Sequence, residues 1–596
     1  MKTHLLAEHG KTAWRIVMAH PAHETVKLAC DELFHFVMQM SGAALPVQTE
    51  LVADGEYEIL VGNSGRLAHH GIHVDWDELG EEGFVMQSAE HYLLLAGATP
   101  RGTLYAVYAF LEEELGCRWF ASDCARIPKK AVLAFSQVSR VEKPAFESRE
   151  AYWRDAFDGA FAVRNRMNSN KADISIRQGG RMKFYNFHHS FNDLLSPGEY
   201  FDQHPEYFSL VNGVRLRDRT QLCLTNPEVL QIAIARVRQW IRENPDCRVF
   251  SVAQNDWGNY CTCPACAALD AREGSPAGTM IAFVNQVAEA IHEEYPHIYL
   301  HTFAYQYTRK APRTIRPHPN VIVRLCSIEC CFSHPLDGTH AAPLAPQEKQ
   351  PRGVQCGGPD SNAFLRDLRE WSAICNHLYI WDYTTQFHNY LQPMPNFDAL
   401  CRNLRLFRDM GVKGVLEQGN FSHGGGGHLA ELEAYLQAKL LWNPDCDMQA
   451  HMMDFLNGYY GEAAAPLVFA YIEGWQQAVR PWHMRIYDSA HAPYITEELL
   501  EKSVNLLGEA LRLTSGARQR ARLSRLCASM DFLLISRLPL GTPGRNAMID
   551  RFGWALREAG IDEIHERWTL EDALAQMKAA DDERMQKRSL TNDYKM

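Results

Sequence analysis

The sequence predicts an α/β protein built on a (β/α)8 barrel, with a small α/β domain before the barrel and a helical domain after it. Residues 141–445 repeat a strand-then-helix rhythm, whereas residues 1–140 mix short strands with helices and residues 446–596 show helical periodicity alone. Eight strand–helix units over about 280 residues are typical of a barrel. A doubly wound sheet is the structural alternative, but it rarely needs so many units in succession.

The N-terminal domain, residues 1–140, is predicted from bounded apolar runs and two helical patterns. Apolar residues recur at helical spacing over 23–41, and a second helical pattern covers 101–116, with Gly116 placed to end it. Short apolar runs predict strands at 15–20, 57–62 and 91–97. A connector at 128–145 follows and contains Lys, Pro and Ser.

The barrel, residues 141–445, is predicted from eight strand candidates and the helices between them. The strands are expected at 146–153, 183–189, 221–226, 249–256, 299–307, 321–329, 378–385 and 412–420. Helical patterns separate most of them, at 227–243, 278–295, 361–376, 396–410 and 428–441. Asn226 and Pro227 mark the start of the first helix, because Asn caps a helix N-terminus and Pro suits its first turn.

The last region, residues 446–596, lacks strand signals and is predicted to be helical. The helical patterns cover 447–460, 464–479, 496–514, 516–535 and 546–559.

Composition and charge exclude several classes of partner. The chain is 46% hydrophobic and 22% charged, with a formal net charge of −12, which argues against a nucleic-acid surface. It has no stretch near the roughly 18 apolar residues of a membrane span, and its polar N-terminus does not resemble a signal peptide. We therefore expect a cytoplasmic protein with reduced thiols and no membrane partner. A secreted protein trimmed of its signal would look the same, and a homo-oligomer is compatible with this composition.

Carboxylates stand at several predicted strand ends, where a barrel places its catalytic groups. They are Asp256, Glu329, Asp382 and Glu417. Glycoside hydrolysis needs two carboxyl groups, because one protonates the leaving oxygen while the other attacks the sugar or activates water. Each of them alone is more often a helix cap or an ion-pair partner, but their joint occurrence favours catalysis. Glu329 interrupts an apolar, Cys-rich segment, where desolvation would raise its pKa and suit a general acid.

Aromatic and polar residues at the same strand ends are candidates for substrate binding, since aromatic faces stack on sugars. They are Arg149, His188, His189, Asn255, Trp257, Tyr305, Trp381 and Tyr383. For the two histidines, packing in a loop is an equally good interpretation. His423 and the glycine run at 424–427 are expected to form a mobile loop over the site, because glycine permits unusual dihedral angles.

Three cysteines, Cys261, Cys263 and Cys266, lie within six residues and could form part of a zinc site. A fourth ligand at standard spacing is missing, and nothing in the sequence connects them with Cys326, Cys330 or Cys331. We therefore predict structural thiols, with no metal and no cofactor. A hydrolase that uses a metal in this loop remains an alternative.

Several segments together resemble a bacterial family known as domain of unknown function 4838, part of which is classified as glycoside hydrolase family 163. The resemblance spans most of residues 15–460. It rests on RGTLYAVYAFLEEELGCRWF (101–120), RNRMN (164–168), HHSF (188–191), LTNPEV (224–229), SVAQNDWGNYCTCPAC (251–266), LCSIECC (325–331), YIWDY (379–383) and GVLEQG (414–419). It implies a first domain like those before the barrels of hexosaminidases and α-glucuronidases (families 20 and 67), then a barrel and a helical region. Characterised members act as endo-β-N-acetylglucosaminidases on complex N-glycans.

The resemblance also implies a catalytic pair, Asp256 and Glu329, with Glu417 and Asp382 as alternates. Substrate-assisted hexosaminidases carry two adjacent acids after the fourth strand, where this chain has Asn255 and Asp256; Asn255 could orient an acetamido group. We therefore expect a glycosidase that cleaves an N-acetylhexosamine-containing glycan by carboxylate acid/base catalysis. An α-glucuronidase-like exo-glycosidase and a non-catalytic carbohydrate-binding protein are the alternatives, and retaining and inverting chemistry both stay open.

Overall fold

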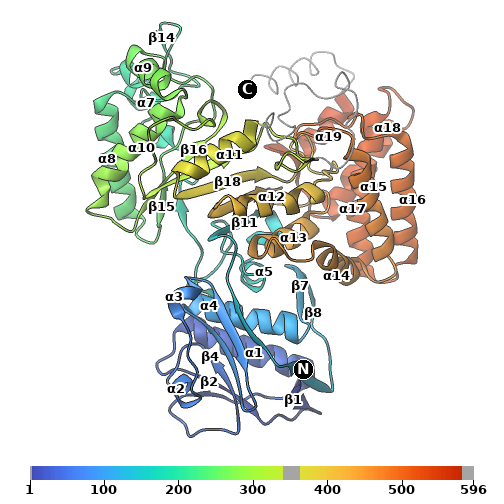
Figure 1. Cartoon of the computed structure of the whole chain (residues 1–596). Coiled ribbons are helices and arrows are strands. Elements are labelled where there is room, and N and C mark those ends of the chain that lie inside the picture. Colours follow the sequence, from blue (N-terminus) through green and yellow to red (C-terminus); the bar gives the residue numbers. More distant parts are fainter. Residues whose placement is uncertain (1–2, 340–362, 580–596) are drawn as a thin grey trace. The chain divides into compact units, whose positions relative to one another are not determined.

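The computed structural model describes residues 3–339 and 363–579 (Figure 1). The chain forms two compact units that are not consecutive blocks of sequence. Unit 1 comprises Met1–Arg181, Leu429–Pro466 and Leu513–Arg522, and unit 2 comprises Met182–His428, Leu467–Arg512 and Leu523–Met596.

Unit 1 is built on a mixed six-stranded sheet. Its strand order is β10 (Ser139–Glu142), β5 (Phe84–Ser88), β6 (Tyr92–Gly97), β4 (Tyr57–Val61), β2 (Trp14–Met18) and β3 (Val47–Thr49). Strands β6, β4, β2 and β3 run parallel, while β5 is antiparallel to both its neighbours. Helices α1 (Glu24–Ser41) and α4 (Pro100–Ala109) pack together, and α4 also packs on β6. The strands predicted at 15–20, 57–62 and 91–97 and the helices predicted at 23–41 and 101–116 are confirmed, whereas β3 and β5 were not predicted. The segment 128–145, predicted as a connector, contains β9 (Val132–Ser136) and β10.

The other elements of unit 1 include two strand pairs, one further strand and more helices. Strand β1 (Thr3–Glu8) pairs with β9 (Val132–Ser136), and β7 (Arg118–Ala121) pairs with β8 (Cys124–Arg126). Strand β11 (Ser148–Tyr152) packs on α13 (Ala430–Trp442), which in turn packs on α14 (Met448–Tyr460). Shorter helices are α2 (Arg66–His69), α3 (Trp76–Leu79) and α5 (Gly159–Arg164).

Unit 2 contains a parallel sheet with helices beside it (Figure 1). The strand order is β19 (Gly414–Gln418), β18 (His377–Tyr383), β17 (Val321–Cys326), β16 (Tyr299–Ala304), β15 (Val249–Ser251) and β12 (Phe184–Tyr185), and every pair is parallel. The longer helices between these strands are α8 (Pro227–Glu243), α9 (Pro264–Glu273), α10 (Ala277–His292), α11 (Ala363–Ile374) and α12 (Phe397–Asp409). All six residues of β17 are buried, because both faces of a parallel sheet are covered.

The structure departs from the predicted barrel at one of its eight strands. The segment predicted as a strand at 221–226 makes only an isolated antiparallel bridge, Phe208 with Leu222. Its polar groups have other partners: Gln221 bonds the backbone of a neighbouring loop, and Asn226 caps α8 as predicted. The first predicted strand, at 146–153, is confirmed as β11, and its residues are counted in unit 1. Unit 2 therefore shows a curled parallel sheet of half-barrel type, and a closed (β/α)8 barrel stays a prediction.

The C-terminal region is helical, as predicted, apart from one small hairpin. Its helices are α15 (Ala465–Val479), α16 (Glu497–Leu513), α17 (Ala517–Arg537), α18 (Arg545–Glu558) and α19 (Leu570–Ala579). Strands β20 (Glu563–His565) and β21 (Trp568–Thr569) form the hairpin between α18 and α19. Among the described residues, none of these or the earlier helices combines the length and apolarity that a membrane crossing requires. The first two positions of the helix predicted at 361–376 lie outside the described residues.

Candidate active site

Asp256 lies just beyond the C-terminal end of β15 and forms a cluster with Tyr305 and His189. The Tyr305 hydroxyl donates a hydrogen bond to Asp256 Oδ1 at 3.0 Å, and His189 Nε2 lies 3.7 Å from the same oxygen. The Asp256 side chain is 41% exposed, whereas Tyr305 is buried. The cluster therefore joins the ends of three neighbouring strands, β12, β15 and β16, and leaves the carboxylate open to a substrate.

The orientation of His189 follows from its second nitrogen. His189 Nδ1 lies 2.6 Å from the carbonyl oxygen of Gln254, and since a carbonyl only accepts, Nδ1 must carry the proton. Nε2 therefore faces Asp256. Burial lowers the pKa of His189, and the carboxylate of Asp256 only partly offsets that effect. The imidazole is consequently neutral at pH 7 and acts on Asp256 as a polar neighbour rather than as a cation.

Tyr305 is held in place by the side chains around it. Gln306 Nε2 donates to the Tyr305 hydroxyl at 3.0 Å, and Gln254 Nε2 donates to the Tyr305 carbonyl at 3.1 Å. Thr308 Oγ1 donates to Gln254 Oε1 at 2.6 Å. Gln306 adopts a φ of +52°, a left-handed conformation that costs about 1–3 kcal/mol for a residue other than glycine. Such strain persists where surrounding contacts determine the geometry, as they do here.

Asn255, which was predicted to bind substrate, instead holds the loop that carries Asp256. Its side-chain nitrogen donates to Asn192 Oδ1 at 3.0 Å and to the Thr220 carbonyl at 2.9 Å, and the residue is buried. Gln221 accepts from the Asn255 backbone at 2.8 Å and donates to the Trp257 carbonyl at 2.6 Å. Both N–H donors of the Asn255 side chain are therefore used within the protein and are not available to a sugar.

Trp257 is the exposed aromatic residue of this loop. Its ring is 37% exposed and lies 5.8 Å from the guanidinium carbon of Arg219. The indole is thus partly open to solvent, and its role in binding a sugar stays a prediction.

Glu329 lies beyond β17 in a setting different from the predicted one. Its carboxylate pairs with Arg309 Nη1 at 3.1 Å and its side chain is 32% exposed, so the expected desolvated, apolar environment is wrong. Arg309 Nε also binds Asp367 at 2.7 Å.

Glu329 and Asp256 both influence the thiol of Cys326. Burial raises the pKa of the Cys326 thiol at the end of β17, and the negative charges of Glu329 and Asp256 raise it further. Cys326 also packs in one cluster with Tyr305, the hydrogen-bond partner of Asp256.

Asp382 and Glu417, the alternate acids, lie on the face of the sheet opposite to the one that carries Trp381 and Gln418. Trp381 pairs in register with Leu416, and Trp381 Nε1 donates to Gln418 Oε1 at 2.7 Å, so these side chains share one face. Alternation then places Asp382 and Glu417 on the opposite face. Asp382 accepts hydrogen bonds from Ser327 and from Asn403 on α12, and burial raises its pKa to about 6. Glu417 is fully buried.

Trp381 and Tyr383 contribute to the inner face of the sheet. The Trp381 ring stacks on Phe187 with centroids 5.7 Å apart and meets Phe303 edge-on at 5.8 Å. Tyr383 is largely buried and meets Phe387 edge-on at 5.9 Å. These rings pack against one another and are not freely exposed platforms.

The C-terminal hairpin contributes two charged residues that the sequence did not predict. Burial raises the pKa of Glu566, and the nearby charge of Asp256 raises it further. The positive charge of Arg567 in turn lowers the pKa of His189. Glu566 and Arg567 form the turn of the β20–β21 hairpin, and the short alternation around Trp568 is the only local signal that could have indicated it.

His423 and His188 lie at the edge of this arrangement. His423 is 88% exposed, and its Nδ1 lies 3.7 Å from Asp562, while the Gly424 amide donates to Asp562 at 2.8 Å. The predicted glycine loop therefore contacts the hairpin region directly. His188 is exposed and faces the carbonyl of its neighbour His189 at 3.5 Å.

Arg149, the remaining predicted binding residue, lies in the core of unit 1. Its guanidinium pairs with Glu82 at 2.5 Å and donates to the carbonyls of Arg166 and Phe146 at 2.9 and 2.7 Å. It is fully buried. These partners give Arg149 a structural role rather than the predicted role in binding.

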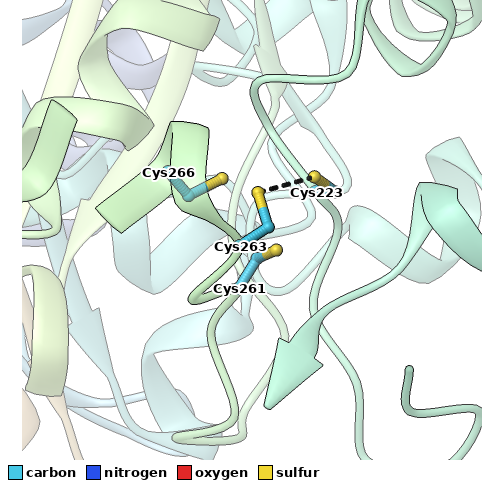
Figure 2. A group of neighbouring side chains, drawn as sticks. All are labelled: Cys223, Cys261, Cys263 and Cys266. Carbon is cyan, nitrogen blue, oxygen red and sulfur yellow. Dashed lines mark hydrogen bonds between the residues drawn. The ribbon is translucent and has the colours of Figure 1, made fainter. Parts of the chain in front are cut away.

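The group of three cysteines has a fourth member. Cys223 Sγ lies 3.7 Å from Cys263 Sγ, close to Cys261 and Cys266 (Figure 2). No fourth ligand lies at standard spacing in the sequence, but the fold places Cys223, from a separate segment, beside the three cysteines.

Comparisons with known proteins give two family matches. The family described as domain of unknown function (DUF4838) matches residues 119–473, and the glycosyl hydrolase family 67 N-terminus matches residues 2–110. No curated protein matches the chain.

Solved structures of glycoside hydrolases are similar to the chain. One is BtGH115A, a family GH115 4-O-methyl-α-glucuronidase with specificity for decorated arabinogalactans, at 12% identity and a TM-score of 0.57; the match covers 95% of this chain and 81% of that one. Another is a GH138 enzyme targeting pectin rhamnogalacturonan II, at 9% identity and a TM-score of 0.45, with 95% and 78% covered. At 12% identity, the first likeness shows a shared fold.

Proposed function

The chain belongs to the DUF4838 family, and on that premise we propose that it cleaves a glycosidic bond in a glycan that contains N-acetylhexosamine. That the protein is a glycosidase agrees with its first domain, which matches the N-terminus of family 67 glycosyl hydrolases. The substrate and the roles of individual residues are the proposed part.

The observation that best supports the proposal is the pair of carboxylates that follow β15 and β17. Asp256 is open to solvent and receives the Tyr305 hydroxyl, while Glu329 is oriented by Arg309. We assign Asp256 and Glu329 as the catalytic pair, one serving as the acid and the other as nucleophile or base. Tyr305 positions Asp256 through its hydroxyl.

An N-acetylhexosamine fits the uncharged groups near this pair. Trp257 offers an exposed aromatic face for the apolar side of a sugar ring. His189 is neutral, and its Nε2 is directed toward the cluster, where it can accept a hydrogen bond from a hydroxyl or an acetamido N–H. The family resemblance implies the same class of sugar.

A second candidate substrate is a uronic acid. The charge of Arg567 acts on His189 beside Asp256, and arginine is the residue best suited to bind a carboxylate. The family 67 domain match and the shared fold with an α-glucuronidase are consistent with this candidate.

A product assay separates the candidates. The full chain is incubated with a complex N-glycan and with glucuronic acid-substituted oligosaccharides, and the products are identified by mass spectrometry. We expect cleavage next to an N-acetylglucosamine. Release of uronic acid would support the second candidate and overturn the first, while binding without turnover of either class would indicate a carbohydrate-binding protein.

A further inference from the structure

Four buried cysteines meet beside the loop that carries Asp256. Cys263 and Cys266 come from the start of α9, Cys261 from the loop before it, and Cys223 from a separate segment (Figure 2). All four sulfur atoms lie within 4.8 Å of one another.

The distances between the sulfurs fit a shared metal better than a disulfide. Cys223 Sγ and Cys263 Sγ are 3.7 Å apart, whereas a disulfide needs about 2.0 Å. Four thiolates placed tetrahedrally at about 2.3 Å from a zinc ion would be separated by about 3.8 Å. We propose that Cys223, Cys261, Cys263 and Cys266 bind one Zn²⁺ ion.

The donor set defines what the ion would do. Four soft sulfur ligands in a tetrahedron select zinc or iron. A site with four protein ligands has no open position for water or substrate, so it is structural rather than catalytic. The proposed zinc ion therefore takes no part in hydrolysis, in contrast to the alternative of a metal-dependent hydrolase.

The surroundings suit a negatively charged zinc–thiolate centre. The Leu210 amide donates to Cys261 Sγ at 3.4 Å, and Thr225 Oγ1 lies 3.2 Å from Cys266 Sγ. Arg215 Nη1 lies 3.8 Å from Cys261 Sγ. Cys263 is the N-cap residue of α9, where the helix dipole favours negative charge. Donors and positive charge of this kind typically orient metal ligands and tune their affinity.

The four cysteines lie next to the contacts that hold the loop of Asp256. Cys223 follows Gln221, whose side chain bonds the backbone at Asn255 and Trp257, on either side of Asp256. Cys261 lies a few residues after Asp256 in the same loop. The zinc ion would thus hold the segment of Gln221 and the loop of Asp256 together, and so stabilise the hydrogen bonds between them.

The test measures metal in the purified full chain, without any substrate. We expect one zinc ion per chain by plasma mass spectrometry. Cys223→Ser should lose zinc, whereas Cys375→Ser, which changes another buried cysteine of unit 2 outside the cluster, should keep it. Cobalt added to metal-free protein should give the visible bands of tetrahedral thiolate ligation.

Several results would overturn the proposal. They are a chain that lacks zinc and takes up neither zinc nor cobalt, a chain that holds stoichiometric iron, and a Cys223→Ser variant with undiminished zinc. If Cys223→Ser does not fold, the zinc content and the cobalt spectrum of the wild-type chain decide the matter. Because these readouts need no turnover, failure of the zinc proposal is distinguishable from failure of the proposed glycosidase substrate.

Discussion

Replacing Tyr305 by Phe removes the hydroxyl that donates to Asp256 at 3.0 Å and keeps the ring in place. A hydrogen bond to a charged group contributes about 1.5–3 kcal/mol. If that bond orients Asp256 for the reaction, its loss lowers kcat/KM by about 10- to 150-fold, since each 1.36 kcal/mol corresponds to a factor of ten. The folded state loses less, about 0.5–1.5 kcal/mol, because the Asp256 side chain is 41% exposed and water can replace the lost donor.

The assay compares kcat/KM and the thermal midpoint of this variant with those of Tyr307→Phe. Tyr307 lies two residues further on and stacks on Tyr260 with centroids 4.7 Å apart, without a hydrogen bond to Asp256. We expect Tyr307→Phe to retain near-wild-type kcat/KM. Equal kcat/KM for the two variants would refute the role assigned to the Tyr305 hydroxyl.

Three further predictions concern stability and the support of the loop. Burial raises the pKa of Glu433 to about 8, so folding takes up a proton there. The free energy of unfolding that this protonation contributes is fully present below pH 4.5 and is lost as the pH rises through 8. In denaturant titrations above pH 8, Glu433→Gln should therefore be more stable than wild type by about 3–6 kcal/mol. Free energies of unfolding that change with pH in the same way in both proteins would contradict this. Lys439 pairs with Glu112 where each side chain is 4% exposed. Lys439→Met should cost about 3–5 kcal/mol of unfolding free energy, because it leaves a buried carboxylate with less compensation; a loss below about 1 kcal/mol in the same titration would count against it. Gln221→Ala should lower kcat more than it raises KM by loosening the loop around Asp256, and unchanged steady-state kinetics would argue that this loop is held by other contacts.

The parallel sheet of unit 2 was predictable because its strands are apolar throughout. β16 and β17 are buried on both faces, so their runs stand out from the helical periodicity around them. The segment at 221–226 gave a false strand signal, since its apolar residues alternate but Gln221 and Cys223 interact with a distant loop. Local periodicity carries no information on such partners.

In the candidate site, too, the sequence predicts what depends on neighbouring residues and not what depends on distant ones. Asp256 could be placed because it closes the apolar run at 249–256, although the buried strand β15 itself ends at Ser251. The environment of Glu329 could not, because Arg309 reaches it from a different loop. Glu566 and Cys223 join their clusters from remote parts of the chain, and only the folded structure brings them there.

The central claim is that Asp256 is a catalytic carboxylate of a glycosidase, and its direct test is the kcat/KM of Asp256→Asn on the N-glycan substrate. The control is Asp202→Asn, which changes an exposed aspartate paired with Arg217 at 2.6 Å, away from the cluster. General acid–base catalysis contributes about 10²- to 10⁴-fold, so Asp256→Asn should lose at least the lower figure while the control stays near wild type. An Asp256→Asn variant with wild-type kcat/KM would contradict the account.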